Sequence, residues 1–134
     1  MSQAKHQLTP TEWEIMEAIW RLLETEPAGE ISVRDVVDRG AFEPAKAYTT
    51  VQTLMNTLQR KGVLKRRKLG LVNFYRPVFE RREMVDRATS SLLDRLFEGS
   101  GLKLVNFMMD NSKLSEDEIE ALQEMINRHR EDEE

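Results

Sequence analysis

A stripe of uncharged polar side chains runs along residues 48–60. At about 100° per residue, a helix over this segment places the stripe opposite an apolar side that includes Val51, Met55 and Leu58. Amides and hydroxyls hydrogen-bond to base edges in the DNA major groove, and threonine methyl groups contact thymine. A solvent-facing helix usually carries charged residues on its polar side instead. The residues of this stripe, our candidates for base reading, are Thr49, Gln52, Thr53 and Asn56.

Positive charge is concentrated around this stripe. The chain has 134 residues and a formal net charge of -4, yet residues 44–79 contain eight Lys or Arg and no Asp or Glu. A basic block over several structural elements is the electrostatic signature of a polyanion-binding surface, although a solvated basic surface would have the same composition. Cations beside the stripe would bind phosphates and supply affinity that does not depend on sequence. The candidates for phosphate binding are Lys46, Arg60, Lys61, Lys65, Arg66, Arg67 and Lys68.

Three helices are predicted in the first half of the chain. Thr9 and Glu12 form a Thr-x-x-Glu capping box, which begins a helix with a wide apolar face. Ser32 begins a second helix, which ends at Gly40. The third helix carries the polar stripe and stops at Gly62.

A β-hairpin is predicted after the third helix. Residues 63–69 and 71–78 are rich in Val, Leu, Phe and Tyr and are joined at Gly70, which favours two strands around a turn. Three helices and a hairpin in this order form a winged helix-turn-helix, whose recognition helix enters the groove while the hairpin, or wing, follows the neighbouring backbone. We therefore predict a winged-helix DNA-binding domain over residues 1–79.

Three more helices are predicted over residues 80–134, with Gly99 and Gly101 before the second of them and Ser115 capping the last. We expect the acidic residues 131–134 to lie outside the last helix. Helices of this size bury little alone, so their apolar stripes require a partner, most simply a second copy of the chain. The fold class is thus mostly α with a small hairpin wing, and this region is a helical dimerisation domain. Its candidate dimer contacts are Val85, Leu92, Leu96, Ile119, Leu122 and Ile126.

The composition argues against several other classes of protein. The chain has no cysteine, and its two histidines lie near opposite ends, so we expect neither a metal site nor a catalytic site. We also predict no cofactor and no enzymatic activity, because no glycine-rich phosphate loop is present. No segment approaches the about 20 apolar residues of a membrane span, and the N-terminus does not resemble a signal peptide. We expect a cytoplasmic protein without membrane insertion.

The chain resembles one known family along nearly its whole length. The resemblance is carried by LTPTEWEIMEAIW, AYTTVQTLMNTLQRKGVLKR, FYRP after the glycine turn, and LSEDEIEALQEMI. These segments are similar to the penicillinase and methicillin-resistance repressors and their copper-responsive relatives. The resemblance implies a homodimeric transcriptional repressor that binds a palindromic operator in double-stranded DNA. By motif match, it assigns base reading to Thr49, Thr50, Gln52 and Thr53.

The chain also departs from that family at three positions. Relatives often carry arginine where this chain has Thr57, and a basic residue where it has Leu71. The first aromatic residue of their last strand is Asn73 here. These departures affect individual phosphate contacts and leave the implied fold unchanged.

The resemblance further implies a route of inactivation. In relatives from resistance operons, a membrane sensor-protease signals, and the repressor is cut at an Asn-Phe bond in its C-terminal domain. Asn106 and Phe107 occupy the matching position. Cleavage there would remove apolar surface that the dimer needs and would weaken two-site binding. The alternative is that Phe107 is a packing residue with an asparagine beside it.

Two other functions are compatible with the same residues. A winged helix can serve as a protein-interaction module, in which case the polar stripe is a tolerated surface. The chain could also be a small-molecule-responsive regulator with a pocket between its domains. DNA binding differs from both in its steep loss of affinity as salt rises, because each neutralised phosphate releases counterions.

Overall fold

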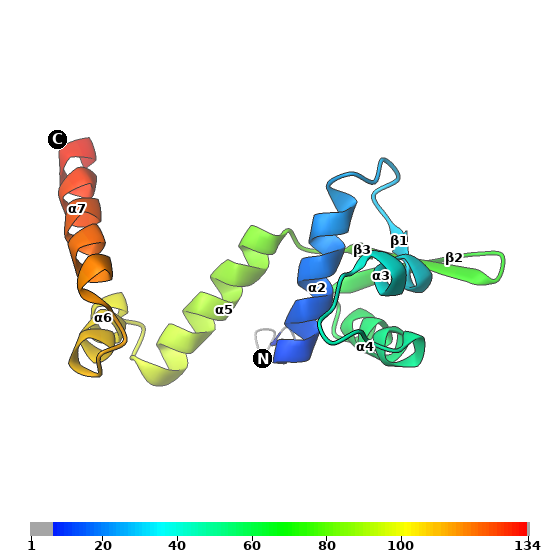
Figure 1. The fold of residues 1–134 in the computed structure, drawn as a ribbon, viewed down its shortest axis with the longest axis horizontal. Coiled ribbons are helices and arrows are strands. Elements are labelled where there is room, and N and C mark those ends of the chain that lie inside the picture. Colours follow the sequence, from blue (N-terminus) through cyan, green and yellow to red (C-terminus); the bar gives the residue numbers. More distant parts are fainter. Residues whose placement is uncertain (1–6, 134) are drawn as a thin grey trace. The chain divides into compact units, whose positions relative to one another are not determined.

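The computed structural model describes residues 7–133, so the first six residues of the predicted winged-helix domain lie outside the described residues. It confirms a mostly helical fold with a small antiparallel sheet (Figure 1). The chain divides into two compact units, which we call unit 1, ending at Thr89, and unit 2, beginning at Ser90. Each is described by itself.

The three helices expected in unit 1 are present, and local hydrogen bonds explain where they begin. They are α2 (Pro10–Leu23), α3 (Val33–Arg39) and α4 (Tyr48–Arg60). The capping box of α2 is complete: Thr9 Oγ1 accepts the Glu12 N–H at 3.2 Å, and Glu12 Oε1 accepts the Thr9 N–H at 2.8 Å. Ser32 Oγ accepts the Asp35 N–H at 3.2 Å and caps α3.

The sheet of unit 1 has one strand more than the expected hairpin. β2 (Leu64–Leu69) and β3 (Val72–Pro77) pair antiparallel around Gly70, whose φ of +64° suits glycine. β1 (Ile31–Ser32) adds to the other edge of β3, which gives the order β1-β3-β2. The hairpin projects beyond the helices at one end of the unit (Figure 1). Sequence periodicity could not indicate β1, because a two-residue strand has no alternating pattern.

The core of unit 1 lies between its helices and the inner face of the sheet. Apolar side chains from α2, α3, α4 and all three strands are buried together in it. Met84, near the start of α5 (Arg81–Leu96), is buried in the same core. The Trp20 indole N–H donates to the Phe79 carbonyl at 3.1 Å. Unit 1 therefore extends past residue 79, because the first turns of α5 pack on its core.

Unit 2 contains the rest of α5, then α6 (Gly101–Asp110) and α7 (Glu116–Glu133). The Ser115 hydroxyl accepts the Glu118 N–H at 3.1 Å and caps α7, as expected. The expectation that the acidic end lies outside this helix is wrong, because α7 continues through residues 131–133. Glutamate is a good helix former, and His129 and Glu133 approach to 3.3 Å one turn apart. Neither α6 nor α7 contains a buried residue.

Within residues 7–133, no helix combines the length and the apolar character that crossing a membrane requires.

Candidate nucleic-acid interface

The two sides of α4 differ as its sequence predicted. Val51, Met55 and Leu58 are fully buried and fix the helix on the core. The opposite side is open to solvent, the N-cap residue Ala47 provides no side-chain hydrogen bond, and the first turn of α4 contains no acidic residue. Unoccupied N–H groups and a missing negative charge make this end of the helix attractive to anions. The exposed candidates for base reading are Thr49, Thr50, Gln52 and Thr53.

Asn56 is placed differently from the rest of the stripe. It is half-buried, and its Oδ1 accepts hydrogen bonds from the Tyr75 hydroxyl at 2.7 Å and from Arg66 Nη1 at 3.4 Å. Tyr75 is buried in β3. Asn56 therefore joins α4 to the hairpin and orients Arg66 beside the exposed stripe, a role that the helix pattern alone did not indicate.

Two predicted phosphate ligands form ion pairs with α2. Lys61 Nζ lies 2.7 Å from Glu12 Oε1 and donates to the Gln7 carbonyl at 3.0 Å. Lys46 Nζ lies 3.0 Å from Glu14 Oε2. Because Lys46 precedes α4 and Lys61 ends it, these pairs fasten both ends of the helix to α2.

The ion pair with Lys61 changes the pKa of the Glu12 carboxyl group. Burial raises the pKa of Glu12, but hydrogen bonds from Lys61 and from the Thr9 N–H outweigh burial, so that the pKa lies below its ordinary value. The carboxylate thus stays charged at neutral pH and holds Lys61.

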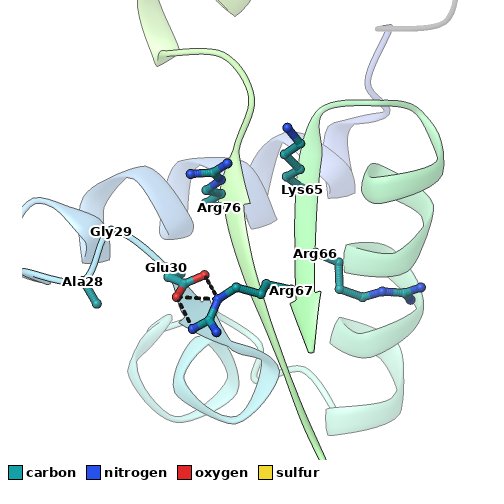
Figure 2. A pocket seen from close by; sticks show the side chains of 7 residues that line it. All are labelled: Ala28, Gly29, Glu30, Lys65, Arg66, Arg67 and Arg76. Atoms are coloured by element: carbon teal, nitrogen blue, oxygen red, sulfur yellow. Dashed lines mark hydrogen bonds and ion pairs between the residues drawn. The ribbon is translucent and has the colours of Figure 1, made fainter. Parts of the chain in front are cut away.

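The wing presents its cations on two different faces. Side chains alternate along a strand, so Arg66 and Lys68 leave β2 on one face, and Lys65 and Arg67 leave it on the other. Figure 2 shows Arg66 extending toward α4 while Arg67 reaches across β3 to Glu30. We call the first the inner face and the second the outer face of the wing. Of the inner-face cations, Arg66 lies beside α4, where it contacts Asn56.

Arg67 is held on the outer face by a two-pronged contact with Glu30. Its Nε and Nη2 donate to Glu30 Oε1 at 3.1 and 2.5 Å, and its guanidinium lies 5.8 Å from the Phe74 ring centroid. The hydrogen bonds from Arg67 lower the pKa of the Glu30 carboxyl, burial raises it, and the charges of Arg67 and Arg76 lower it further. Glu30 is therefore an anion at neutral pH that competes with any other anion for Arg67.

The three departures from the family pattern also have defined surroundings. Thr57 Oγ1 accepts a hydrogen bond from Arg60 Nη2 at 3.1 Å. The guanidinium of Arg60 therefore lies beside the position where relatives carry an arginine. Leu71 is 98% exposed at the tip of the wing. Asn73 is the cross-strand partner of Lys68 on the inner face.

Sequence reasoning missed four residues around this interface. Tyr75 acts through a contact between the sheet and α4, and Glu30 acts through a contact across the sheet; the helix and strand patterns indicate neither. Arg76 counts among the eight cations, but its position beside Lys65 depends on the strand register. The Arg34 guanidinium of α3 lies 4.6 Å from the Tyr48 ring centroid and adds a cation near the start of α4.

The candidate dimer contacts belong to two units and differ in exposure. Val85 lies in unit 1 and is about one-third exposed. In unit 2, Leu96 and Ile126 are exposed, whereas Leu92, Ile119 and Leu122 are half-buried.

The candidate cleavage bond lies inside α6. Asn106 and Phe107 are both exposed, and the Phe107 ring centroid lies 5.8 Å from that of Phe97. The Phe107 carbonyl accepts hydrogen bonds from the main-chain and side-chain nitrogens of Asn111 at 3.1 and 2.9 Å. The bond is therefore part of a regular helix and not of an extended loop.

Comparisons with known proteins agree with this architecture. The family model described as penicillinase repressor matches residues 8–128. An uncharacterized 16.5 kDa protein of Latilactobacillus sakei is 28% identical over 94% of this chain and 82% of its own length. The penicillinase repressor of Bacillus licheniformis is 26% identical over 92% of both chains. The methicillin resistance regulatory protein MecI of Staphylococcus aureus is 23% identical over 96% of this chain and 99% of its own. The chain therefore belongs to the penicillinase repressor family of DNA-binding transcriptional repressors, which are not enzymes.

Proposed function

We propose that this protein represses transcription as a homodimer that places α4 of each copy in the major groove of a palindromic operator. The observation that carries the proposal is the exposed, uncharged stripe of α4, which has cations on both sides and no acid in residues 44–79. Hydroxyls and amides can read base edges there without repelling phosphates. A surface built for water alone would carry Glu and Lys.

The residues of this interface have two roles: some contact bases and others contact phosphates. Thr49, Thr50, Gln52 and Thr53 read bases, and Asn56 contributes its amide nitrogen while its oxygen accepts from Tyr75 and Arg66. The phosphate ligands are Arg60 at the end of α4 and Arg66 and Lys68 on the inner face of the wing. Lys46 and Lys61 support binding indirectly, because their ion pairs fix the position of α4.

A second copy of the chain would cover the apolar side chains of unit 2. Its α6 and α7 bury no residue, and Leu96, Phe107 and Ile126 are 64%, 49% and 48% exposed. A unit this small with so little buried surface rarely folds alone. Two copies would also present two recognition helices, as a palindromic operator requires.

Cleavage at Asn106–Phe107 is part of the proposal as a means of inactivation. A protease needs an extended strand, so α6 would have to open locally before the bond is cut. Because no residue of α6 is buried, the free energy needed to open it locally is small. Induction of the native host by a signal that acts through a membrane sensor-protease should yield a fragment ending at Asn106, and an intact chain would contradict this step.

Two substitutions distinguish the proposed base contact of Thr53 from the proposed phosphate contact of Arg66. Thr53→Ala should weaken binding to the upstream duplex of the protein's own gene more than binding to random DNA, because a base contact carries sequence information. Arg66→Gln should weaken both equally, because a phosphate contact carries none. Equal losses for Thr53→Ala would remove it from the base-reading set. Binding that does not depend on salt would instead favour a protein-interaction module or a small-molecule-responsive regulator.

A further inference from the structure

Three cations share the outer face of the wing, away from α4. Lys65 and Arg67 lie two residues apart on β2, so their side chains leave the strand on the same side. Arg76 of β3 is the direct cross-strand partner of Lys65. These cations are therefore separated from Arg66, which contacts α4 through Asn56 on the inner face.

The charge of the outer face is not balanced. Lys65 and Arg76 are like charges in directly opposite strand positions, an arrangement that destabilises a sheet. Within residues 7–133, neither of them forms an ion pair. Glu30 lies beside them but binds Arg67. Three positive charges thus face one negative charge, which leaves an excess of two.

A hollow of about 480 Å³ lies over these cations. Its walls are the three outer-face cations, the neighbouring Arg66 and the turn Ala28–Glu30 (Figure 2). Gly29 of that turn has a φ of +71° and no atom within 4 Å of the position a Cβ would take, so the hollow is open there. The volume falls in the range of about 300–1,000 Å³ found for small-ligand sites.

We infer that this hollow binds a phosphate group, with Lys65 and Arg76 as its primary ligands and Arg67 shared between the phosphate and Glu30. A guanidinium fork matches two phosphate oxygens, and the excess of two positive charges matches a phosphate dianion. Glu30 sets the affinity by competing for Arg67. Where the phosphate is that of bound DNA, the inference rests on the proposed function and adds Arg76 and the competing Glu30 to the phosphate contacts predicted for Lys65 and Arg67. Where the phosphate is a free anion, the inference goes beyond operator binding.

The phosphate can come from two sources with the same chemistry. One is the backbone of bound DNA, in which case the outer face extends the contact with the duplex. The other is a free phosphate or phosphorylated small molecule, in which case the hollow senses an anion. Binding at the hollow and reading by α4 involve different side chains and can fail independently.

The test is a titration of the full-length protein with sodium phosphate, compared with sodium chloride at equal ionic strength, followed by amide NMR. Residues 28–30, 65–67 and 76 should shift saturably with phosphate alone. Arg76→Gln should weaken the binding by about tenfold, as expected for one lost charge-assisted hydrogen bond. Glu30→Gln should strengthen it, a gain that misfolding cannot mimic. Arg82→Gln, which removes an exposed cation of α5 outside the wing, is the matched control and should leave it unchanged.

Duplex binding by the same variants identifies the source. If Arg76→Gln lowers the magnitude of the salt slope on random DNA by about 0.9, the phosphate is that of the backbone. If the slope is unchanged while free phosphate binding is lost, the ligand is a free anion. The inference is overturned if phosphate and chloride act alike and the slope is also unchanged. It is equally overturned if Arg82→Gln and Arg76→Gln lose phosphate binding to the same extent. Thr53→Ala, measured in parallel, reports on operator reading alone.

Discussion

Replacing Lys61 by Gln should destabilise the fold, whereas replacing Arg66 by Gln should weaken DNA binding. Both cations occur in the same basic block, so composition alone makes them equivalent. Their surroundings differ. Lys61 Nζ lies 2.7 Å from a carboxylate of a residue that is only 3% exposed, whereas Arg66 is exposed and makes one long hydrogen bond, at 3.4 Å.

The size of the stability loss follows from those contacts. A hydrogen bond to a charged group contributes about 1.5–3 kcal/mol. Because 28% of the Lys61 side chain is exposed, solvent screens part of this, and about 1–2 kcal/mol is expected. For a domain of this size, that loss lowers the Tm by about 5–15 °C. Arg66→Gln should change the free energy of unfolding by less than about 0.5 kcal/mol, as is usual for surface substitutions.

Thermal unfolding followed by circular dichroism and duplex binding across a salt series measure the two effects. Arg66→Gln should reduce the magnitude of the salt slope by about 0.9, which corresponds to one phosphate contact. Lys61→Gln should leave the slope unchanged at temperatures where the variant is folded. The reasoning is refuted if Lys61→Gln keeps the wild-type Tm and lowers the slope, because Lys61 would then bind a phosphate and not Glu12.

Three further predictions concern stability and assembly. The pKa of Glu12 is lower in the folded protein than its ordinary value of 4.5, so its ion pair with Lys61 should stabilise the fold fully above pH 4.5 and lose this contribution as the pH falls through the folded pKa. In urea melts at different pH values, the free energy of unfolding of Glu12→Gln should therefore fall less steeply with acid. Tyr75→Phe removes the 2.7 Å hydrogen bond to Asn56 and should lower the free energy of unfolding by about 1 kcal/mol in urea titrations, with an unchanged m-value. Ile126→Glu should shift sedimentation toward the monomer, whereas Ala121→Glu should not, because Ala121 is exposed and lies about 140° from Ile126 around the same helix. Equal masses for both variants would exclude Ile126 from a dimer interface.

Local signals in the sequence were sufficient for most of the fold. The capping box at Thr9 and the cap at Ser32 mark helix starts, because a side-chain hydrogen bond to a nearby N–H depends only on neighbouring residues. Gly70 marks the hairpin for a similar reason. The two-residue strand β1 had no such signal and became visible only through its pairing with β3.

The candidate interface could be predicted in part. The buried and exposed sides of α4 follow from helical periodicity, and the structure agrees with it. The separation of Arg66 from Arg67 follows from the alternation of a strand, but which face meets α4 depends on tertiary packing. Glu30 is far from Arg67 in sequence, and their contact could not be inferred without the register of β1, β3 and β2.

Binding of the full-length protein to a labelled duplex from its own upstream region, beside a scrambled duplex and across a salt series, tests the central claim most directly. A repressor that reads bases through α4 and binds phosphates through its cations should prefer the upstream duplex, lose affinity steeply as salt rises, and saturate at two chains per site. Equal binding to both duplexes at every salt concentration would contradict operator reading by α4.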